Sequence, residues 1–392
     1  MKVMIGRRRA IQLGLAVTCT LGPLVAFTPA ARAAEPGSGF TTVATGFDNP
    51  RGLAFGEDGR LYVAEAGSGG PTCATGGPGG GSLCIGLSSG ISVITDDGAH
   101  HRILSDLAST SGQGGFFATG ADGLSSNDDG HLFTVMTECP QVAGHIPPGV
   151  FDPSLISSVQ GQLGQVLSVN DGGFRAIAGV GAFDWNWSST HMNLVPGQFP
   201  DCNPYGILAG EHGHWVVDAA SNTLDRVGRD GTIEIVAFFP NPPVSDAVPT
   251  CLARGPDGAL YVGELTGNGN TPGSSVVWRV DTGDEHPTPT MWATGLTAVT
   301  GCGFADGSFY ATEFSTLGVD NAAPGTGAVV RVPPHSTTPV TVANGLSFPN
   351  GFVADEANIY VSNWSIAPAV IPPGSPPFQP GEVVRIGLHH DE

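Results

Sequence analysis

The chain has 392 residues, of which 40% are hydrophobic, and it contains 59 glycines and 32 prolines. This length can bury a sizeable core, but glycine and proline at this frequency exclude long helices and favour many short strands joined by turns. The formal net charge of −20 argues against a nucleic-acid partner and against an anionic membrane surface, since both would be repelled.

Residues 1–33 have the pattern of a secretory signal peptide. Basic residues at positions 2 and 7–9 precede an apolar run over 10–27, and Ala31-Arg32-Ala33 forms a small-x-small cleavage site. The run is too short and too polar for a comfortable membrane span, so we expect cleavage, secretion and no stable membrane insertion. The arginines at 7–9 leave the Sec and twin-arginine export routes both open.

Removal of this segment makes the remaining chain more acidic. Five of the 15 basic residues and none of the 35 acidic residues lie in 1–33, which leaves 10 minus 35, a net charge of −25 for residues 34–392. The mature chain contains no lysine. This balance favours solubility, cations or cationic partners.

A short unit recurs six times along the mature chain. It consists of a small apolar strand, a tight turn with Gly, Asp or Asn, and a second strand of the form Leu-Tyr-Val. The first strands begin at Pro50, Ala121, Pro204, Pro249, Val299 and Pro349, and the second strands begin at Leu61, Leu132, Trp215, Leu260, Phe309 and Ile359. The spacing of the last four units, 45 to 50 residues, is typical of propeller repeats.

Each unit continues into outer strands. Third strands are expected at 91–94, 164–169, 224–227, 276–280, 328–332 and 382–386, and fourth strands at 101–107, 174–182, 233–239, 290–295 and 339–344. The sixth unit has no fourth strand of its own, whereas residues 40–47 belong to no later hairpin. Pairing 40–47 with 382–386 would close the ring and remove its open edges. We therefore predict an all-β fold, a six-bladed β-propeller of four-stranded blades in a single domain over residues 34–392.

The long insertions of this propeller should gather at one end, which we call the loop face. They cover residues 66–90, 109–119, 138–162, 185–203, 265–274, 315–327 and 365–381. The opposite end has only tight turns. Because function concentrates where loops elaborate a rigid scaffold, we expect the binding site on the loop face.

Polar residues should surround the central channel at this end. Innermost strands begin with Arg51, Asp122, Tyr205, Thr250, Thr300 and Asn350, and second strands end at Glu65, Glu264, Glu313 and Asn363. One interpretation is a ligand site in which Asp122, Asn350 and some of the glutamates hold Ca²⁺, another divalent cation or a small polar ligand. The alternative is that these groups cap strand ends and bind channel water. No nucleophile elbow, phosphate loop or dinucleotide motif is present, so no catalytic residue is assigned.

Six cysteines remain in the mature chain, and an even number in an oxidising compartment indicates disulfides. Cys73 and Cys84 flank a glycine-rich loop and form one candidate pair. Cys139 and Cys202 lie in long insertions and form another. For Cys251 and Cys302 the sequence indicates no particular pairing.

The blade motifs, above all Asn49-Pro50-Arg51-Gly52-Leu53-Ala54-Phe55 and Phe348-Pro349-Asn350-Gly351-Phe352, resemble the ScyD/ScyE family of exported bacterial propellers. The likeness covers essentially the whole mature chain, and no well-defined catalytic site belongs to that family. Similar motifs occur in gluconolactonase-like propellers. That second resemblance implies a metal held by Glu65, Asp122 and Asn350.

Two functions follow as hypotheses. The first is an exported, non-enzymatic propeller, expected to be a monomer, that binds a small-molecule ligand or an extracellular protein through its loop face. The second is a metal-dependent hydrolase of the lactonase type with its site at the mouth of the channel.

Overall fold

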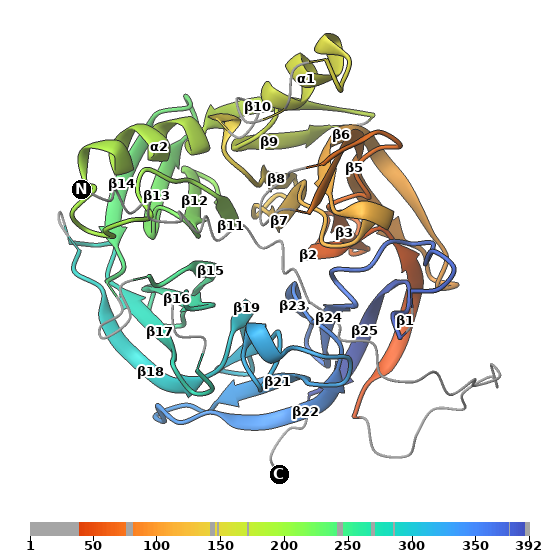
Figure 1. Ribbon diagram of the computed structural model, residues 1–392. Coiled ribbons are helices and arrows are strands. Elements are labelled where there is room, and N and C mark those ends of the chain that lie inside the picture. Colours follow the sequence, from red (N-terminus) through yellow and green to blue (C-terminus); the bar gives the residue numbers. More distant parts are fainter. Residues whose placement is uncertain are drawn as a thin grey trace, which may run out of the picture.

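The computed structural model describes residues 39–75, 81–141, 146, 149–170, 172–240, 246–267, 271–284, 287–375 and 377–388. The predicted signal peptide lies outside these ranges. The described residues form six antiparallel sheets around a central axis, the six-bladed β-propeller that the repeats predict (Figure 1).

The strands of each blade are given from the axis outward. Blade one consists of β2 (Pro50–Phe55), β3 (Leu61–Glu65), β5 (Ser82–Ile94) and β6 (His100–Ser111), and blade two of β7 (Ala121–Ser126), β8 (Leu132–Met136), β9 (Gln165–Asn170) and β10 (Gly173–Gly179). Blade three consists of β11 (Pro204–Gly210), β12 (Gly213–Asp218), β13 (Thr223–Gly228) and β14 (Ile233–Phe238). A short extra strand, β4 (Cys73–Thr75), pairs with β5.

Blade four consists of β15 (Pro249–Arg254), β16 (Leu260–Glu264), β17 (Ser275–Val280) and β18 (Thr290–Leu296). Blade five consists of β19 (Val299–Ala305), β20 (Ser308–Glu313), β21 (Gly327–Val332) and β22 (Val340–Leu346). Blade six consists of β23 (Phe352–Ala354), β24 (Asn358–Asn363), β25 (Gly381–Gly387) and β1 (Thr41–Phe47).

Strand β1 closes the ring as the sequence predicts. It pairs antiparallel with β25, with Thr41 opposite Arg385 and Phe47 opposite Gly381. Phe47 has no exposed surface, and its ring stacks on His100 of blade one with 4.1 Å between the ring centroids. The strand therefore belongs to blade six and is also packed against blade one.

Glycine at the third residue of the repeat lets neighbouring innermost strands approach closely. A Cβ atom on Gly301 would lie 2.1 Å from the carbonyl oxygen of Asn350, and one on Gly351 would lie 2.2 Å from that of Arg51. Blade four has Cys251 at this position, and it forms a disulfide with Cys302 of blade five. This third disulfide, which the sequence did not indicate, thus joins two neighbouring innermost strands.

The other two disulfides, Cys73–Cys84 and Cys139–Cys202, confirm the two candidate pairs. Three disulfides in one domain indicate an oxidising environment.

Within the described ranges, the helices lack the length and apolarity needed to cross a membrane.

Two helices lie where the sequence predicted irregular or extended chain. Helix α1 (Pro153–Gln160) forms within insertion 138–162, where the Asp152 carboxylate accepts a 2.7 Å hydrogen bond from Ser154 N and Pro153 begins the helix.

Helix α2 (Val180–Thr190) replaces both the end of the strand expected over 174–182 and the start of the expected loop 185–203. That strand prediction was wrong after Gly179. The buried residues of α2 are Val180, Gly181, Asp184 and Ser188, which have helical spacing. Because two of them are polar, the apolar pattern of an amphipathic helix is absent from the sequence.

Candidate functional site

Four of the predicted channel residues meet at the axis and form what we call the axial cluster, Arg51, Asp122, Tyr205 and Asn350. Each is only 3–4% exposed. Arg51 Nε lies 3.7 Å from Asp122 Oδ2, and Arg51 Nη2 donates a 2.7 Å hydrogen bond to the carbonyl of Ala118. Asn350 Nδ2 donates to the Tyr205 hydroxyl at 2.6 Å. The cluster therefore connects blades one, two, three and six.

Charge in the axial cluster is balanced within the protein. Burial raises the pKa of Asp122 to about 6, and the charge of Arg51 opposes this shift. Burial and the neighbouring Asp122 carboxylate also raise the pKa of Tyr205, so its hydroxyl stays protonated at neutral pH. Because a guanidinium already stands beside Asp122, a metal ion at this carboxylate would face a competing positive charge.

Apolar side chains from several blades pack on the loop face around the ring of Tyr205. They include Phe314, Phe348, Trp364 and Ile366, together with the partly buried Phe116 and Phe378. The ring centroids of Phe348 and Phe378 are 5.7 Å apart. This packing explains why the axial cluster is almost fully buried.

The two predicted threonines join neighbouring blades rather than the axial cluster. Thr250 Oγ1 donates a 2.7 Å hydrogen bond to Val299 O, and Thr300 Oγ1 donates a 2.8 Å bond to Pro349 O. Both side chains are buried. Their hydroxyl groups are thus used to hold the ring together.

Replacing Thr300 by valine should destabilise the fold by about 1–2 kcal/mol, because the buried carbonyl of Pro349 loses its side-chain donor while the packing volume is kept. Chemical denaturation would measure this loss. The exposed Thr45→Val serves as the control and should change stability by less than about 0.5 kcal/mol. Equal effects of the two substitutions would contradict a joining role for Thr300.

The residues that end the second strands accept hydrogen bonds from backbone N–H groups, with donor–acceptor distances of 2.7–3.0 Å. The donors are Asp48 N to Glu65, Val276 N to Glu264, Thr297 N to Glu313 and Ser347 N to Asn363. Asp218 ends β12 in the same way by accepting from Asn203 N, an equivalence that the sequence analysis missed. Burial raises the pKa of Glu264 to about 8 and that of Glu313 to about 7.

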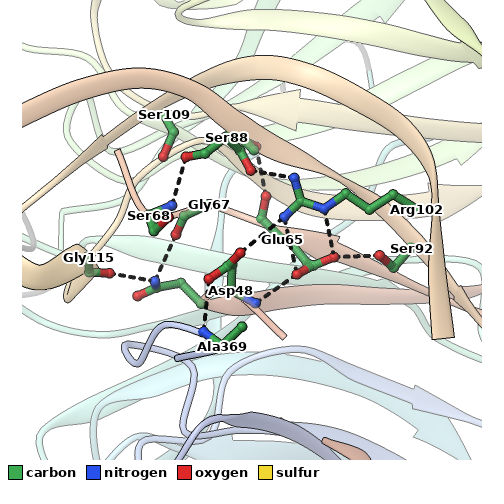
Figure 2. A network of polar contacts seen from close by, with 12 residues as sticks. Asp48, Glu65, Gly67, Ser68, Ser88, Ser92, Arg102, Ser109, Gly115 and Ala369 are labelled. Atoms are coloured by element: carbon green, nitrogen blue, oxygen red, sulfur yellow. Dashed lines mark hydrogen bonds and ion pairs between the residues drawn. The ribbon is translucent and has the colours of Figure 1, made fainter. Parts of the chain in front are cut away.

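Figure 2 shows the network around Glu65. Its carboxylate accepts hydrogen bonds from Ser92 and from Asp48 N, and both its oxygens lie 3.3 Å from Arg102 nitrogens. Asp48 in turn accepts a 2.8 Å bond from Ala369 N, in the long insertion of blade six. Glu65 therefore binds Arg102 while Asp122 pairs with Arg51, and the structure gives the two predicted metal ligands separate cationic partners.

The structure also has a small acidic cavity that the sequence analysis did not predict. It lies between blades three and four on the loop face, has a volume of about 20 Å³, and is lined by Gln198, Asp201, Asn203, Ala219, Ala220, Asp246 and Val248. We call it the acidic cavity. Its residues come from three chain segments next to the starts of β11 and β15 and the end of β12.

Two carboxyls define its chemistry. Asp246 accepts hydrogen bonds from Gln198 Nε2 at 2.7 Å and Asn222 Nδ2 at 3.0 Å, whereas Asp201 accepts one from Cys202 N at 2.9 Å. Burial raises the pKa of both, that of Asp201 to about 7. Gln198 Oε1 has no hydrogen-bond partner in the described structure. The cavity therefore presents carboxylate and amide oxygens to a group about the size of a water molecule.

A wider groove of about 500 Å³ lies on the face of tight turns, at the seam between blades six and one. Its lining includes Phe55, Asp58, Arg60, Asp96, Asp97 and Tyr360. Arg60 and Asp58 form an exposed ion pair there.

Metal binding also depends on how the possible ligands are arranged in space. Over the described ranges, no group of three or more His, Cys, Asp or Glu side chains is arranged to hold a metal ion. Ca²⁺ binding by Glu65, Asp122 and Asn350 stays a prediction, since amide oxygens also serve this ion.

No protein-family model matches the chain, and no curated protein matches it in sequence. Solved structures do share its fold. A gluconolactonase from Xanthomonas campestris aligns with a TM-score of 0.52 and 9% identity over 89% of both chains. A protein of unknown function from Bacteroides thetaiotaomicron aligns with a TM-score of 0.51 and 9% identity over 88% of this chain and 74% of that one.

A virginiamycin B lyase from Staphylococcus aureus covers 89% of this chain and 99% of its own at 13% identity, with a TM-score of 0.47. At such identities the likeness concerns the fold alone. The resemblance to the ScyD/ScyE family therefore continues to rest on the blade motifs.

Proposed function

We propose that this chain is an exported binding protein that captures a cationic group of a small ligand or extracellular protein in the acidic cavity. The observation that supports the proposal best is the pair Asp201 and Asp246, whose carboxyls line a cavity on the loop face. The cavity has room for about one water-sized group, which suits a primary ammonium better than the larger guanidinium. The net charge of −25 in residues 34–392 would steer such a cation toward the protein.

The absence of lysine from the mature chain removes one source of competition for such a ligand. The mature chain has no lysine, so one copy cannot present a lysine side chain to the cavity of another. Competition from self-association through this group is therefore limited to the N-terminal amine.

Calorimetric titration of the mature protein with Nα-acetyl-lysine amide tests the proposal. The neutral Nα-acetyl-norleucine amide and the larger Nα-acetyl-arginine amide are the comparison probes. Asp201→Asn and Asp246→Asn should each weaken lysine binding about tenfold or more, because each removes a partly buried charge partner. Asp97→Asn, in the groove on the opposite face, is the matched control and should bind like the original protein.

The pH dependence follows from Asp201. Its pKa of about 7 means that it ionises as the pH rises from about 6 to 8, a range in which a lysine ammonium stays charged. Affinity should therefore rise across this range, and the rise should be much smaller in Asp201→Asn. Equal affinity for the lysine and norleucine probes at pH 8 would contradict the proposal.

The competing hypothesis of a metal-dependent, lactonase-type hydrolase makes a different prediction. It requires one tightly bound divalent ion per chain and a lactone hydrolysis that Asp122→Asn abolishes. Metal analysis of the purified protein together with such an activity would favour that hypothesis over cation capture.

A further inference from the structure

Helix α2 brings a third carboxyl to two others in the interior of blade three. Asp184 lies on α2, Asp218 at the end of β12 and Asp225 on β13, and each has no exposed surface. The Asp184 carboxyl lies within hydrogen-bonding range of both of the others. We call these three residues the buried carboxyl chain.

Asp218 has the most donors of the three carboxyls; burial raises its pKa, and its hydrogen bonds oppose that shift. Asp218 accepts hydrogen bonds from the N–H groups of Asn203, Ala220 and Ser221 at 2.8–2.9 Å. Asp225 receives a single 3.2 Å bond from Thr223 Oγ1, on Oδ2.

The remaining oxygens are both Asp184 Oδ atoms and Asp225 Oδ1, and none of them has a partner in the described structure. The ion pairs found between described residues involve none of the three carboxyls. Two more anions at this place would be buried without compensation, which is strongly unfavourable.

Either a cation or protons would remove this excess charge. In the part of the chain that the structure describes, these carboxyls are not arranged as a metal site, and three N–H groups already occupy the Asp218 oxygens. Two protons, in contrast, account for every unpartnered oxygen. A proton on Asp225 Oδ1 would donate to one Asp184 oxygen, and a proton on the other Asp184 oxygen would donate to Asp218.

We propose that Asp184 and Asp225 are protonated at neutral pH and form, with the Asp218 carboxylate, a buried carboxyl chain that fastens α2 to blade three and opens at alkaline pH. Burial and the neighbouring carboxylates raise the pKa of both acids well above the usual range. The next charged neighbour is Asp201, which interacts with Asp218, Glu138 and Asp246. These neighbours are also carboxyls, so they favour protonation further.

The buried carboxyl chain is connected to the wall of the acidic cavity. Ser188, one helical turn after Asp184, accepts a hydrogen bond from Asp201 N at 3.1 Å and donates one to Asp201 O at 2.9 Å. The Asp218 carboxylate accepts a hydrogen bond from Asn203 N. Opening should therefore loosen residues 201–203. A resulting loss of ligand binding depends on the proposed function, whereas the stability of the protein does not.

The sign of the stability change follows from proton binding. A raised pKa means that the folded protein keeps protons that the unfolded chain loses, so stability falls as the pH rises from the usual aspartate pKa toward the folded one. The two protons retained by Asp184 and Asp225 should alone raise the unfolding equilibrium constant up to about 100-fold per pH unit in that window, in addition to the contributions of the other buried acids.

Denaturation of the mature protein between pH 5 and 9 tests the proposal, with Asp184→Asn and Asp225→Asn. An amide can donate and accept in place of a protonated carboxyl, so each variant should fold, and its unfolding constant should change about tenfold less per pH unit than that of the original protein. Asp230→Asn, in the exposed turn of the same blade, is the control and should keep the original slope.

Infrared spectroscopy supplies a readout that does not depend on the stability of a variant. The original protein at pH 7 should show a protonated-carboxyl C=O band that Asp184→Asn weakens or, if that variant fails to fold, Asp225→Asn does. Absence of this band, or an unchanged pH slope in both folded variants, would overturn the proposal. A tightly bound Ca²⁺ whose removal lowers the Tm of the original protein but not of Asp184→Asn would overturn it as well.

Discussion

Replacing Arg51 by methionine should destabilise the propeller by about 3–5 kcal/mol at pH 8, because this removes the cationic partner of the buried Asp122 carboxylate. The same change also leaves the carbonyl of Ala118 without its side-chain donor. The loss should be smaller at pH 5, where Asp122, with a pKa of about 6, is largely protonated even beside Arg51.

Two further proteins separate charge from packing in this test. The double variant Arg51→Met with Asp122→Asn should recover part of the stability, since it removes the unpaired charge. Arg60→Met breaks an exposed ion pair with Asp58 and should cost at most about 1 kcal/mol. Similar losses in Arg51→Met and Arg60→Met, measured by urea denaturation, would show that the axial cluster is not the buried charge pair described above.

Removing the disulfide between blades four and five by the double substitution Cys251→Ala and Cys302→Ala should destabilise the protein by about 4 kcal/mol. The bond closes a loop of 51 residues, so its loss returns much conformational freedom to the unfolded chain. It also frees two innermost strands that lie side by side at the axis. Chemical denaturation of the oxidised variant and the original protein would measure the difference.

The disulfide between Cys73 and Cys84 provides an internal control, because it spans only 11 residues and joins strands of a single blade. Its removal should cost about 3 kcal/mol on the same entropic basis. Mass spectrometry of non-reduced peptides should first establish the three pairings. A larger loss for Cys73→Ala with Cys84→Ala than for the blade-bridging pair would contradict the entropic account.

Several features of the fold could be predicted because they depend on contacts that every blade repeats. The unpaired segment 40–47 and the incomplete sixth unit imply the same ring closure, which β1 and β25 then form. The position of Arg51, Asp122, Tyr205 and Asn350 near the axis follows from their place at the start of innermost strands. Their mutual contacts do not, because equivalent positions in blades four and five hold threonines that bond to the next blade instead.

The six-bladed architecture, its closure and two disulfides could be predicted from local repeats, from the positions of cysteines beside a loop or in insertions, and from strand order. Which acids meet could be seen only in the folded chain. Asp201 and Asp246 line one cavity, and Asp184 reaches Asp218 from a helix whose buried face is partly polar. These contacts join segments that no repeat relates, and a carboxyl group can be buried there only where neighbouring N–H groups donate to it or where it stays protonated.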